Sequence, residues 1–255
     1  MSPFSLDRLA VGLLPGEITW SLHFESECES TQDVARAAAD AGADEGWTVV
    51  TDLQHSGRGR QGHTWIAPAG QALLVSIVLR PAVDVLPKLP LLAGLAVAGG
   101  IEASAGVAPD LKWPNDVLLR HQKLAGVLLE RPGNAAVMLG IGVNVDQARA
   151  DLPEGATSLS IELGRPVARE RLLAAILNDL SNAYERADRE GVQWIVPAWR
   201  SRSSMLGQRV RFEYQGTGLE GVAKDISDEG ALQVETSDGH RLELVAGEVQ
   251  RVRLV

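Results

Sequence analysis

The feature that most constrains the fold is a glycine-rich loop that joins two apolar, strand-like runs. The loop, Gly57–Gly62, reads Gly-Arg-Gly-Arg-Gln-Gly and lies between Trp47–Thr51 and Leu73–Leu79. Its glycine spacing matches the fingerprint of dinucleotide-binding folds, in which such a loop opens a helix. Here no helical period follows the loop, Pro68 interrupts the segment, and the next element reads as a strand. The pattern therefore predicts a loop between strands and argues against a nicotinamide site.

Apolar periodicity predicts further helices and strands along the first 206 residues. Helical spacing begins after Ser30, after Pro87 and at Leu172, and the last of these helices ends at Gly191. Strand-like runs, the first two paired around a turn at His121-Gln122, cover Leu111–Leu119, Leu124–Glu130 and Val137–Val145. After Leu206 only short β-rich runs remain, at Gln208–Tyr214, Leu219–Asp225, Ala231–Glu235 and Arg241–Val245. We therefore expect two domains, residues 1–206 and a small β-barrel over residues 207–255.

Composition excludes several classes of protein. The formal net charge of −9 argues against a protein that coats nucleic acid. The single cysteine, Cys28, rules out an intramolecular disulfide and a four-thiolate zinc site, and it fits a reducing, cytoplasmic setting. No signal-peptide pattern opens the chain, and we expect no membrane span, because the most apolar stretch, Leu89–Ile101, is short and rich in glycine and alanine.

Two arginines in the glycine loop, Arg58 and Arg60, stand out against this acidic background. Guanidinium groups bind phosphate or carboxylate oxygens through charge-assisted hydrogen bonds, and glycines let the backbone fold over a ligand. The alternative is a solvated hairpin tip with two surface arginines. The loop alone does not separate these readings.

A second cationic segment follows some fifty residues later. Lys112-Trp113-Pro114-Asn115-Asp116 supplies a lysine, an amide and a carboxylate around a turn, a set suited to ribose, a base edge or a magnesium-bound phosphate. Lys123 precedes the small pair Ala125-Gly126, which leaves space for a bulky ligand. A lysine near a reacting phosphorus stabilises developing charge. An isolated lysine is more often a surface residue, but two lysines that bracket Asn-Asp favour a site.

The polar residues at Ser30-Thr31 have a structural reading as well as a functional one. Ser30 with Asp33 resembles a capping box at the start of a helix, although Asp replaces the usual Glu or Gln. A capped helix N-terminus also offers N–H donors to a polar ligand. The five histidines show no metal-ligand spacing, and no nucleophile–base pair is evident, which argues against a hydrolase.

Five blocks in order resemble the biotin protein ligases, in the monofunctional type without an N-terminal DNA-binding domain. The blocks begin at Ser30-Thr31-Gln32, Gln54, Lys112, Lys123 and Gly140, and they extend to Val145. The resemblance implies an α+β fold: a class II synthetase-like catalytic domain with a mixed sheet flanked by helices, and an SH3-like C-terminal barrel. It also implies that biotin and Mg-ATP, both substrates, give biotinyl-5′-AMP, and that biotin then passes to a lysine of a carboxyl-carrier domain. No tightly bound prosthetic group is implied.

The resemblance assigns roles to individual residues, all by position in its motifs. Lys123, Lys112, Arg58 and Asp116 would be catalytic, and Asp116 is the one candidate to meet magnesium, through Mg-ATP. The remaining roles are biotin binding by Ser30, Thr31, Gln54, Arg58, Gly59, Arg60, Lys123 and Gly126, and nucleotide binding by Arg58, Arg60, Trp65, Asn115 and Asn144. The expected partner is the carrier domain of a biotin-dependent carboxylase, with no nucleic acid or membrane, and the protein would be a monomer or weak dimer.

One position departs from the family pattern, and two other functions stay open. His63 stands where the family often has arginine, which leaves its role in doubt. A lipoate–protein ligase shares the fold and the adenylation step, but its Arg-Arg-x-Ser-Gly-Gly-Gly signature is absent. A biotin-binding regulator without catalysis is the other alternative. Only 29 residues precede Ser30, too few for a winged-helix domain, and both lysines are present, which favours the ligase.

Overall fold

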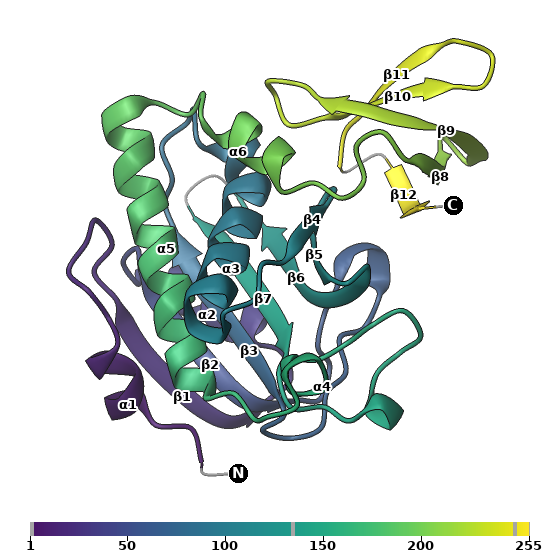
Figure 1. Ribbon diagram of the computed structural model, residues 1–255. Helices are drawn as coiled ribbons and strands as arrows, with labels where there is room; N and C mark the ends of the chain where they lie inside the picture. The colour runs from purple at the N-terminus through teal and green to yellow at the C-terminus, as the bar shows by residue number, and fades with distance from the viewer. Residues whose placement is uncertain (1–2, 134–135, 247–248, 255) are drawn as a thin grey trace.

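A computed structural model of the protein describes residues 3–133, 136–246 and 249–254. Two sheets organise this chain. The larger has seven strands in the order β1-β2-β3-β7-β6-β5-β4, and the smaller has five in the order β11-β10-β9-β8-β12. Figure 1 shows the smaller sheet, in yellow and green, beyond the end of the larger one at which β4 and α6 lie.

The seven-stranded sheet is mixed, as predicted. β1 runs parallel to β2, and every other neighbouring pair is antiparallel. Its strands are β1 (Ser21–Cys28), β2 (Trp47–Gln54), β3 (Ala72–Leu79), β4 (Asp110–Lys112), β5 (Asp116–Leu119), β6 (Gln122–Glu130) and β7 (Val137–Asn144). The sequence pattern missed β1, whose residues are mostly exposed or half-buried and carry only a weak apolar alternation.

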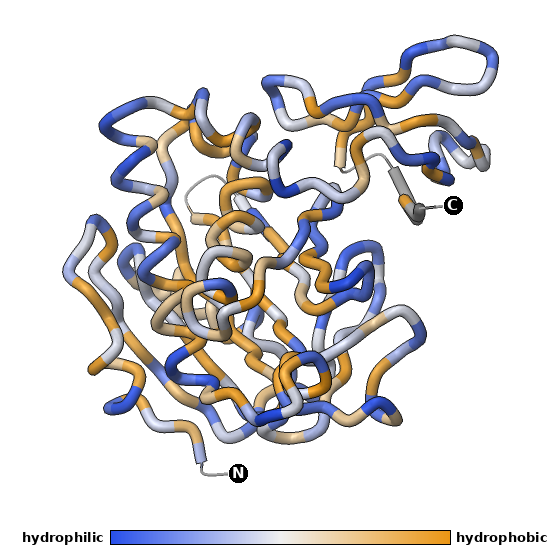
Figure 2. Tube along the Cα trace, in the orientation of Figure 1, coloured by the Kyte–Doolittle hydropathy of each residue, from blue (hydrophilic) through white to orange (hydrophobic). Residues whose placement is uncertain are grey.

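Helices cover both faces of this sheet. The helices are α1 (Leu6–Val11), α2 (Thr31–Asp40), α3 (Leu89–Ala105), α4 (Leu159–Leu163), α5 (Arg169–Glu190) and α6 (Ile195–Ser201), with 3₁₀ turns η1 (Arg60–Gly62), η2 (Leu86–Lys88) and η3 (Arg149–Asp151). Ala35 of α2 packs with Val49 and Met138, whereas their neighbours Val50 and Leu139 belong to the main core with α3 and α5. Successive strand residues point to opposite faces. The tube in Figure 2 is correspondingly orange through the strands and blue on the outer side of α5.

The apolar stretch read from the sequence as Leu89–Ile101 lies within a longer helical stretch, Leu86–Ala105. By length and mean hydropathy, Leu86–Ala105 is apolar enough to cross a membrane. In the structure α3 packs against α5 on one side and against β6, β5 and β4 on the other, and Leu92, Val97 and Ile101 are fully buried. Its apolar character is that of a core helix enclosed on several sides.

The stretch predicted as one strand, Leu111–Leu119, is two strands. β4 and β5 form a hairpin in which Lys112 pairs with Asp116. The Trp113-Pro114 peptide, which is cis, lies in the turn. Proline has no N–H to continue the ladder, so the strand stops there. The following turn has Arg120 and His121 at positive φ, one residue earlier than predicted. The hairpin brings Lys112 and Asp116 together.

The C-terminal region is an antiparallel β-domain, as predicted, and the two-domain α+β class is confirmed. Its strands are β8 (Arg209–Tyr214), β9 (Thr217–Ile226), β10 (Leu232–Thr236), β11 (Arg241–Leu244) and β12 (Val249–Leu254), the last of which the sequence pattern missed. Trp113 Nε1 donates to the Gly230 carbonyl at 3.0 Å, and Arg200 Nε lies 2.6 Å from Asp225 Oδ1. The domain boundary after Leu206 stays a prediction.

Candidate active site

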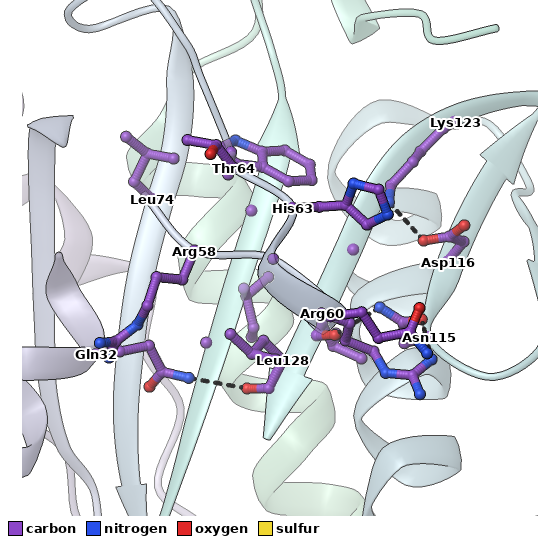
Figure 3. Close-up of a pocket in the computed structure, with 18 of the residues that line it drawn as sticks. Gln32, Arg58, Arg60, His63, Thr64, Leu74, Asn115, Asp116, Lys123 and Leu128 are labelled. Carbon is purple, nitrogen blue, oxygen red and sulfur yellow. Dashed lines mark hydrogen bonds and ion pairs between the residues drawn. The ribbon is translucent and has the colours of Figure 1, made fainter. Parts of the chain in front are cut away.

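A cavity of about 260 Å³ lies on the α2 face of the seven-stranded sheet, where three glycines replace side chains. Gly126 of β6 pairs with Gly142 of β7, and Gly140 lies two residues before Gly142 in the same strand. A Cβ at Gly142 would lie 2.7 Å from the Trp65 indole, and one at Gly140 would lie 3.0 Å from the Gln32 amide. The glycines therefore leave this part of the sheet without side chains. Figure 3 shows Gln32, Arg58 and Lys123 among the larger side chains that line the cavity.

The structure brings together all but one of the predicted site residues. The cavity is lined by Ser30, Thr31, Gln54, Arg58, Gly59, Arg60, Trp65, Lys112, Asn115, Asp116, Lys123 and Gly126, and His63 also lines it. These residues come from α2, β2, the glycine loop, the β4–β5 hairpin and β6. The exception is Asn144.

Asn144 lies outside the cavity, because its amide is committed to the chain around it. Nδ2 donates to the carbonyls of Thr157 at 3.0 Å and Lys123 at 3.4 Å, and Oδ1 accepts from Gln147 Nε2 at 2.9 Å. The side chain is buried. Asn144 thus fixes the backbone that carries Lys123, and it is not positioned to contact a nucleotide in the cavity directly.

At the end where Ser30, Thr31 and Gln54 line the cavity, the side chains are neutral and hydrogen-bonded to one another or to the start of α2. Ser30 caps the helix, with its hydroxyl accepting from Gln32 N at 3.3 Å. Gln54 Oε1 accepts from Thr31 N and Thr31 Oγ1, at 2.8 and 3.0 Å, and Ser76 Oγ donates to Thr31 Oγ1 at 2.8 Å. Because the Gln54 oxygen is held by two donors, its NH₂ is the end of the amide left for a ligand acceptor.

The glycine loop folds back on itself above this end. Gly59 N donates to His63 O at 2.7 Å and Trp65 N donates to Gly57 O at 2.9 Å. A Cβ at Gly57 would lie 2.2 Å from the Trp65 carbonyl oxygen, so only glycine fits at that approach. The loop thereby places Arg58, Arg60 and Trp65 over the sheet.

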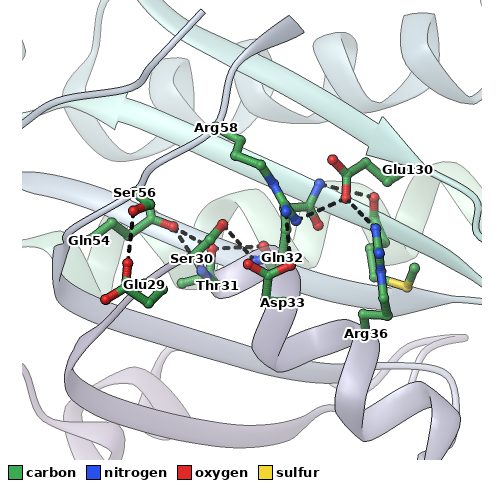
Figure 4. A network of polar contacts seen from close by, with 12 residues as sticks. Glu29, Ser30, Thr31, Gln32, Asp33, Arg36, Gln54, Ser56, Arg58 and Glu130 are labelled. Carbon is green, nitrogen blue, oxygen red and sulfur yellow. Dashed lines mark hydrogen bonds and ion pairs between the residues drawn. The ribbon is translucent and has the colours of Figure 1, made fainter. Parts of the chain in front are cut away.

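Both loop arginines are engaged by groups of the protein itself. Arg58 Nη1 lies 2.8 Å from Asp33 Oδ1, and Arg58 Nη2 lies 3.1 Å from Glu130 Oε2 (Figure 4). Arg60 Nη1 donates to Asn115 Oδ1 at 3.2 Å, and Nη2 donates to the Ala246 carbonyl of the C-terminal domain. Burial lowers the pKa of Arg60, and the nearby Asp116 carboxylate opposes that shift.

Two lysines share one carboxylate at the other end. Lys123 Nζ lies 2.6 Å from Asp116 Oδ1, and Lys112 Nζ lies 3.7 Å from Asp116 Oδ2. Lys123 Nζ is also 5.7 Å from the centre of the Trp65 ring. Among the described residues that line the cavity, Asp116 is the only acidic one, against two lysines and two arginines. This end is therefore a cationic site in an otherwise acidic protein.

Three polar atoms of cavity residues are buried without a hydrogen-bond partner among the described residues. They are Gln32 Oε1, Arg58 Nε and Trp65 Nε1. Buried polar groups in proteins are normally paired, so these three atoms, all in residues that line the cavity, lack the partners expected of them. In the described part of the chain, no three His, Cys, Asp or Glu side chains gather as a metal site.

Sequence reasoning assigned no ligand-binding role to Asp33, Glu130, Gln32, Gly140 or Gly142. Asp33 was read as half of a capping box, but its carboxylate pairs with Arg58. Gln32, Glu130, Gly140 and Gly142 belong to the blocks of the family resemblance, and Gly-x-Gly within an apolar strand is a signal for close approach. The pairing of Asp33 with a loop 25 residues away has no such signal.

Comparisons with known proteins agree with this geometry. Residues 16–146 match the Biotin/lipoate A/B protein ligase family, and residues 205–252 match the Biotin protein ligase C terminal domain. The biotin–[acetyl-CoA-carboxylase] ligase of Mycobacterium tuberculosis is 37% identical over 235 residues, covering 86% of this chain and 84% of that protein. The bifunctional ligase/repressor BirA of Bacillus subtilis is 36% identical over 245 residues, covering 92% and 75%.

A solved structure extends the match to the whole fold. The biotin protein ligase of Aquifex aeolicus in complex with biotin and ATP has a TM-score of 0.80 and 28% identity, and the match covers 92% of this chain and 99% of that one. The family matches, the relatives and the structural likeness agree across both domains. This chain belongs to the biotin protein ligase family.

Proposed function

We propose that the protein is a biotin–protein ligase that acts in two steps. Biotin and Mg-ATP give biotinyl-5′-AMP and pyrophosphate, and a lysine of a biotin carboxyl carrier domain then takes the biotinyl group as an amide. The names of the relatives and the biotin and ATP complex of the Aquifex aeolicus enzyme support this activity. The observation that carries it is one cavity with a neutral, hydrogen-bonded end and a cationic end.

The neutral end suits the ureido ring of biotin. That ring has a carbonyl acceptor and two N–H donors and carries no charge, so a binding site gains most from neutral groups already fixed in place. Thr31 fixes Gln54, Ser76 fixes Thr31, and Ser30 fixes the start of α2. We assign Ser30, Thr31 and Gln54 to biotin, with Gly126 leaving space over the sheet.

The cationic end suits the reacting carboxylate and phosphate. An oxygen of the biotin carboxylate attacks the α-phosphorus of ATP, the bond to the β-phosphate oxygen breaks, and pyrophosphate leaves with its negative charge. Lys123 would stabilise that charge, because a preorganised cation is most effective where charge develops. Asp116 holds Lys112 and Lys123 and so sets their positions.

The nucleotide would lie between the loop and the β4–β5 hairpin. Arg58, Gly59, Arg60 and Trp65 approach from the loop, and Asn115 from the hairpin. Asn144 would act indirectly, because its amide donates to the backbone carbonyl of Lys123. Magnesium would enter bound to the ATP phosphates. Both Asp116 oxygens face lysines, so any contact of Asp116 with magnesium requires a rearrangement.

In the second step the acceptor amine attacks the biotinyl carbonyl, and AMP leaves. The carrier domain of a biotin-dependent carboxylase is the proposed partner, on the printed name of the Mycobacterium tuberculosis relative. A monomer or weak dimer in the cytoplasm, with no nucleic-acid or membrane partner, completes the proposal.

The test is to incubate the protein with Mg-ATP and either biotin or lipoate, and to identify the acyl-adenylate by mass spectrometry. We expect biotinyl-adenylate and, on adding a carrier domain, a carrier heavier by one biotinyl group. Lipoyl-adenylate in its place would favour a lipoate–protein ligase, which the matched family also includes. Biotin binding without pyrophosphate release would favour the non-catalytic regulator.

A further inference from the structure

Four charged side chains form a closed set beside the glycine loop, which we call the Arg58 cluster. It consists of Asp33 and Arg36 of α2, Glu130 at the end of β6, and Arg58 (Figure 4). Glu130 Oε2 accepts from Arg58 Nη2 and from Arg36 Nη2, both at 3.1 Å. Asp33 Oδ1 lies 2.8 Å from Arg58 Nη1. Two carboxylates and two guanidinium groups balance in charge.

The cluster occupies the groups of Arg58 that an anionic ligand would use. Both Nη atoms of Arg58 are paired with acids of the protein, and its Nε is buried without an acceptor among the described residues. Phosphate and carboxylate ligands bind guanidinium through pairs of parallel N–H bonds, which require at least one of the Nη atoms. A ligand anion must therefore displace Asp33, Glu130 or both to bind Arg58 in this way.

Displacement of Arg58 leaves Glu130 with a second ion-pair partner but leaves Asp33 without its ion-pair partner. Arg36 remains beside Glu130 when Arg58 leaves. Asp33 has no second ion-pair partner in the described ranges, and its side chain is 50% exposed. Exposed ion pairs contribute little to stability, so the Asp33 contact is weak enough to exchange and strong enough to bias the loop.

We propose that Asp33 and Glu130 are positioning residues that hold Arg58 in a resting position until the anionic part of the ligand replaces them. Arg58 lies on the glycine loop that lines the cavity, so the loop is the segment that moves when Arg58 changes partner. The inference rests on the proposed ligase function.

Asp33 could hold Arg58 in the resting position or orient it for the ligand. These two roles predict opposite effects of the substitution Asp33→Asn. If Asp33 stabilises the resting loop, Asp33→Asn removes that stabilisation, and the equilibrium shifts toward the ligand-bound loop. If Asp33 instead orients Arg58 for the ligand, the same substitution weakens binding.

The experiment measures release of biotinyl-adenylate from the full-length protein, the KM for ATP and kcat. For Asp33→Asn we expect release to slow and KM to fall, each by about two- to fivefold, as for the loss of one exposed ion pair, with kcat nearly unchanged. Without ligand, trypsin should cut after Arg58 or Arg60 faster than in wild type. Asp33→Glu restores the pair and should return the wild-type values.

Two controls separate this effect from a general change in charge or folding. Asp40→Asn alters the same charge on the same helix, where the residue is exposed and distant from the loop in sequence, and it should leave all three quantities unchanged. In an Arg58→Gln background, Asp33→Asn should have no further effect on release.

Unchanged or faster release in Asp33→Asn, or an equal effect without Arg58, would overturn the resting-position role. If the wild-type protein forms no biotinyl-adenylate, the proposed function fails instead, so the two failures are distinct.

Discussion

The neutral and cationic ends of the cavity differ in how their polar groups are paired before a ligand arrives. At the neutral end, Thr31, Gln54 and Ser76 hydrogen-bond one another within the fold, and Thr31 and Ser76 are buried. At the cationic end, Lys123 is paired with the partly exposed Asp116 carboxylate, and Arg58, from the loop, is paired in the same way with Asp33. The first end is preformed, whereas the second holds acids of the protein where a ligand anion would bind.

This difference explains how one cavity can both bind its ligand selectively and hold the reactive intermediate. A fixed, neutral end gives selectivity, because a ligand that leaves its buried groups unpaired loses binding free energy. An exchangeable, cationic end can close over a reactive acyl phosphate and keep water from it. The glycine loop connects the two ends, since its first residue approaches Gln54 and its arginines reach the acids.

The largest effect is expected at the cationic end. Lys123→Ala should lower the rate of biotinyl-adenylate formation by about 10²-fold, because it removes the cation nearest the proposed reaction centre. Pyrophosphate release under saturating biotin and ATP measures this. Lys224→Ala, on the C-terminal sheet, is a matched control that should keep near-wild-type rates. A folded Lys123→Ala protein with normal turnover would return Lys123 to a surface role.

A smaller effect is expected at the neutral end, and of a different kind. Thr31→Val removes one donor to Gln54 and leaves the buried Ser76 hydroxyl without its acceptor. An unpaired buried group costs about 1–2 kcal/mol, so we expect the Kd for biotin to rise about tenfold. Titration calorimetry with biotin gives the Kd, and Thr48→Val, at a buried threonine of β2 outside the cavity, controls for loss of a hydroxyl. If the Kd for biotin stayed constant while adenylation slowed, the two ends would not have separate roles.

The smallest of these effects concerns retention of the intermediate. Arg58→Gly should release biotinyl-adenylate about fivefold faster, because one charge-assisted contact from the loop to the intermediate is lost at a partly exposed side chain. Biotin attachment to proteins other than the carrier should rise in parallel. Arg189→Gly, at an exposed residue of α5, serves as the comparison. Retention as tight as in wild type would mean that Arg58 does not help to close the loop.

The sequence predicted the parts of this site that depend on local pattern. The capping pattern placed Ser30 at the start of a helix, and the glycine spacing placed Arg58 in a loop between strands. It failed where partners are distant in sequence. Asn144 was expected at the nucleotide, yet its amide is committed to the chain around it, including the carbonyls of Lys123 and Thr157.

Two other failures have physical causes of the same kind. Leu111–Leu119 was read as one strand, although a turn was expected within Lys112–Asp116, because the run is apolar on both sides of Pro114. The structure shows two strands, with Lys112 paired with Asp116. Asp33 satisfied a local capping pattern, so its long-range contact with Arg58 was not considered. Local propensity is a weak guide wherever tertiary contacts decide the outcome.

Hydrogen exchange with and without ligand tests the contrast between the two ends most directly. Amide exchange would be followed in Gly57–Gly62 and in the neighbouring strand Trp47–Gln54, for the protein alone and with biotin and Mg-ATP. Our account expects exchange in the loop to slow markedly when biotinyl-adenylate forms, because the arginines gain the ligand as partner, while exchange in the strand stays the same. A loop equally protected in both states, or a strand that gains protection as strongly as the loop, would contradict it.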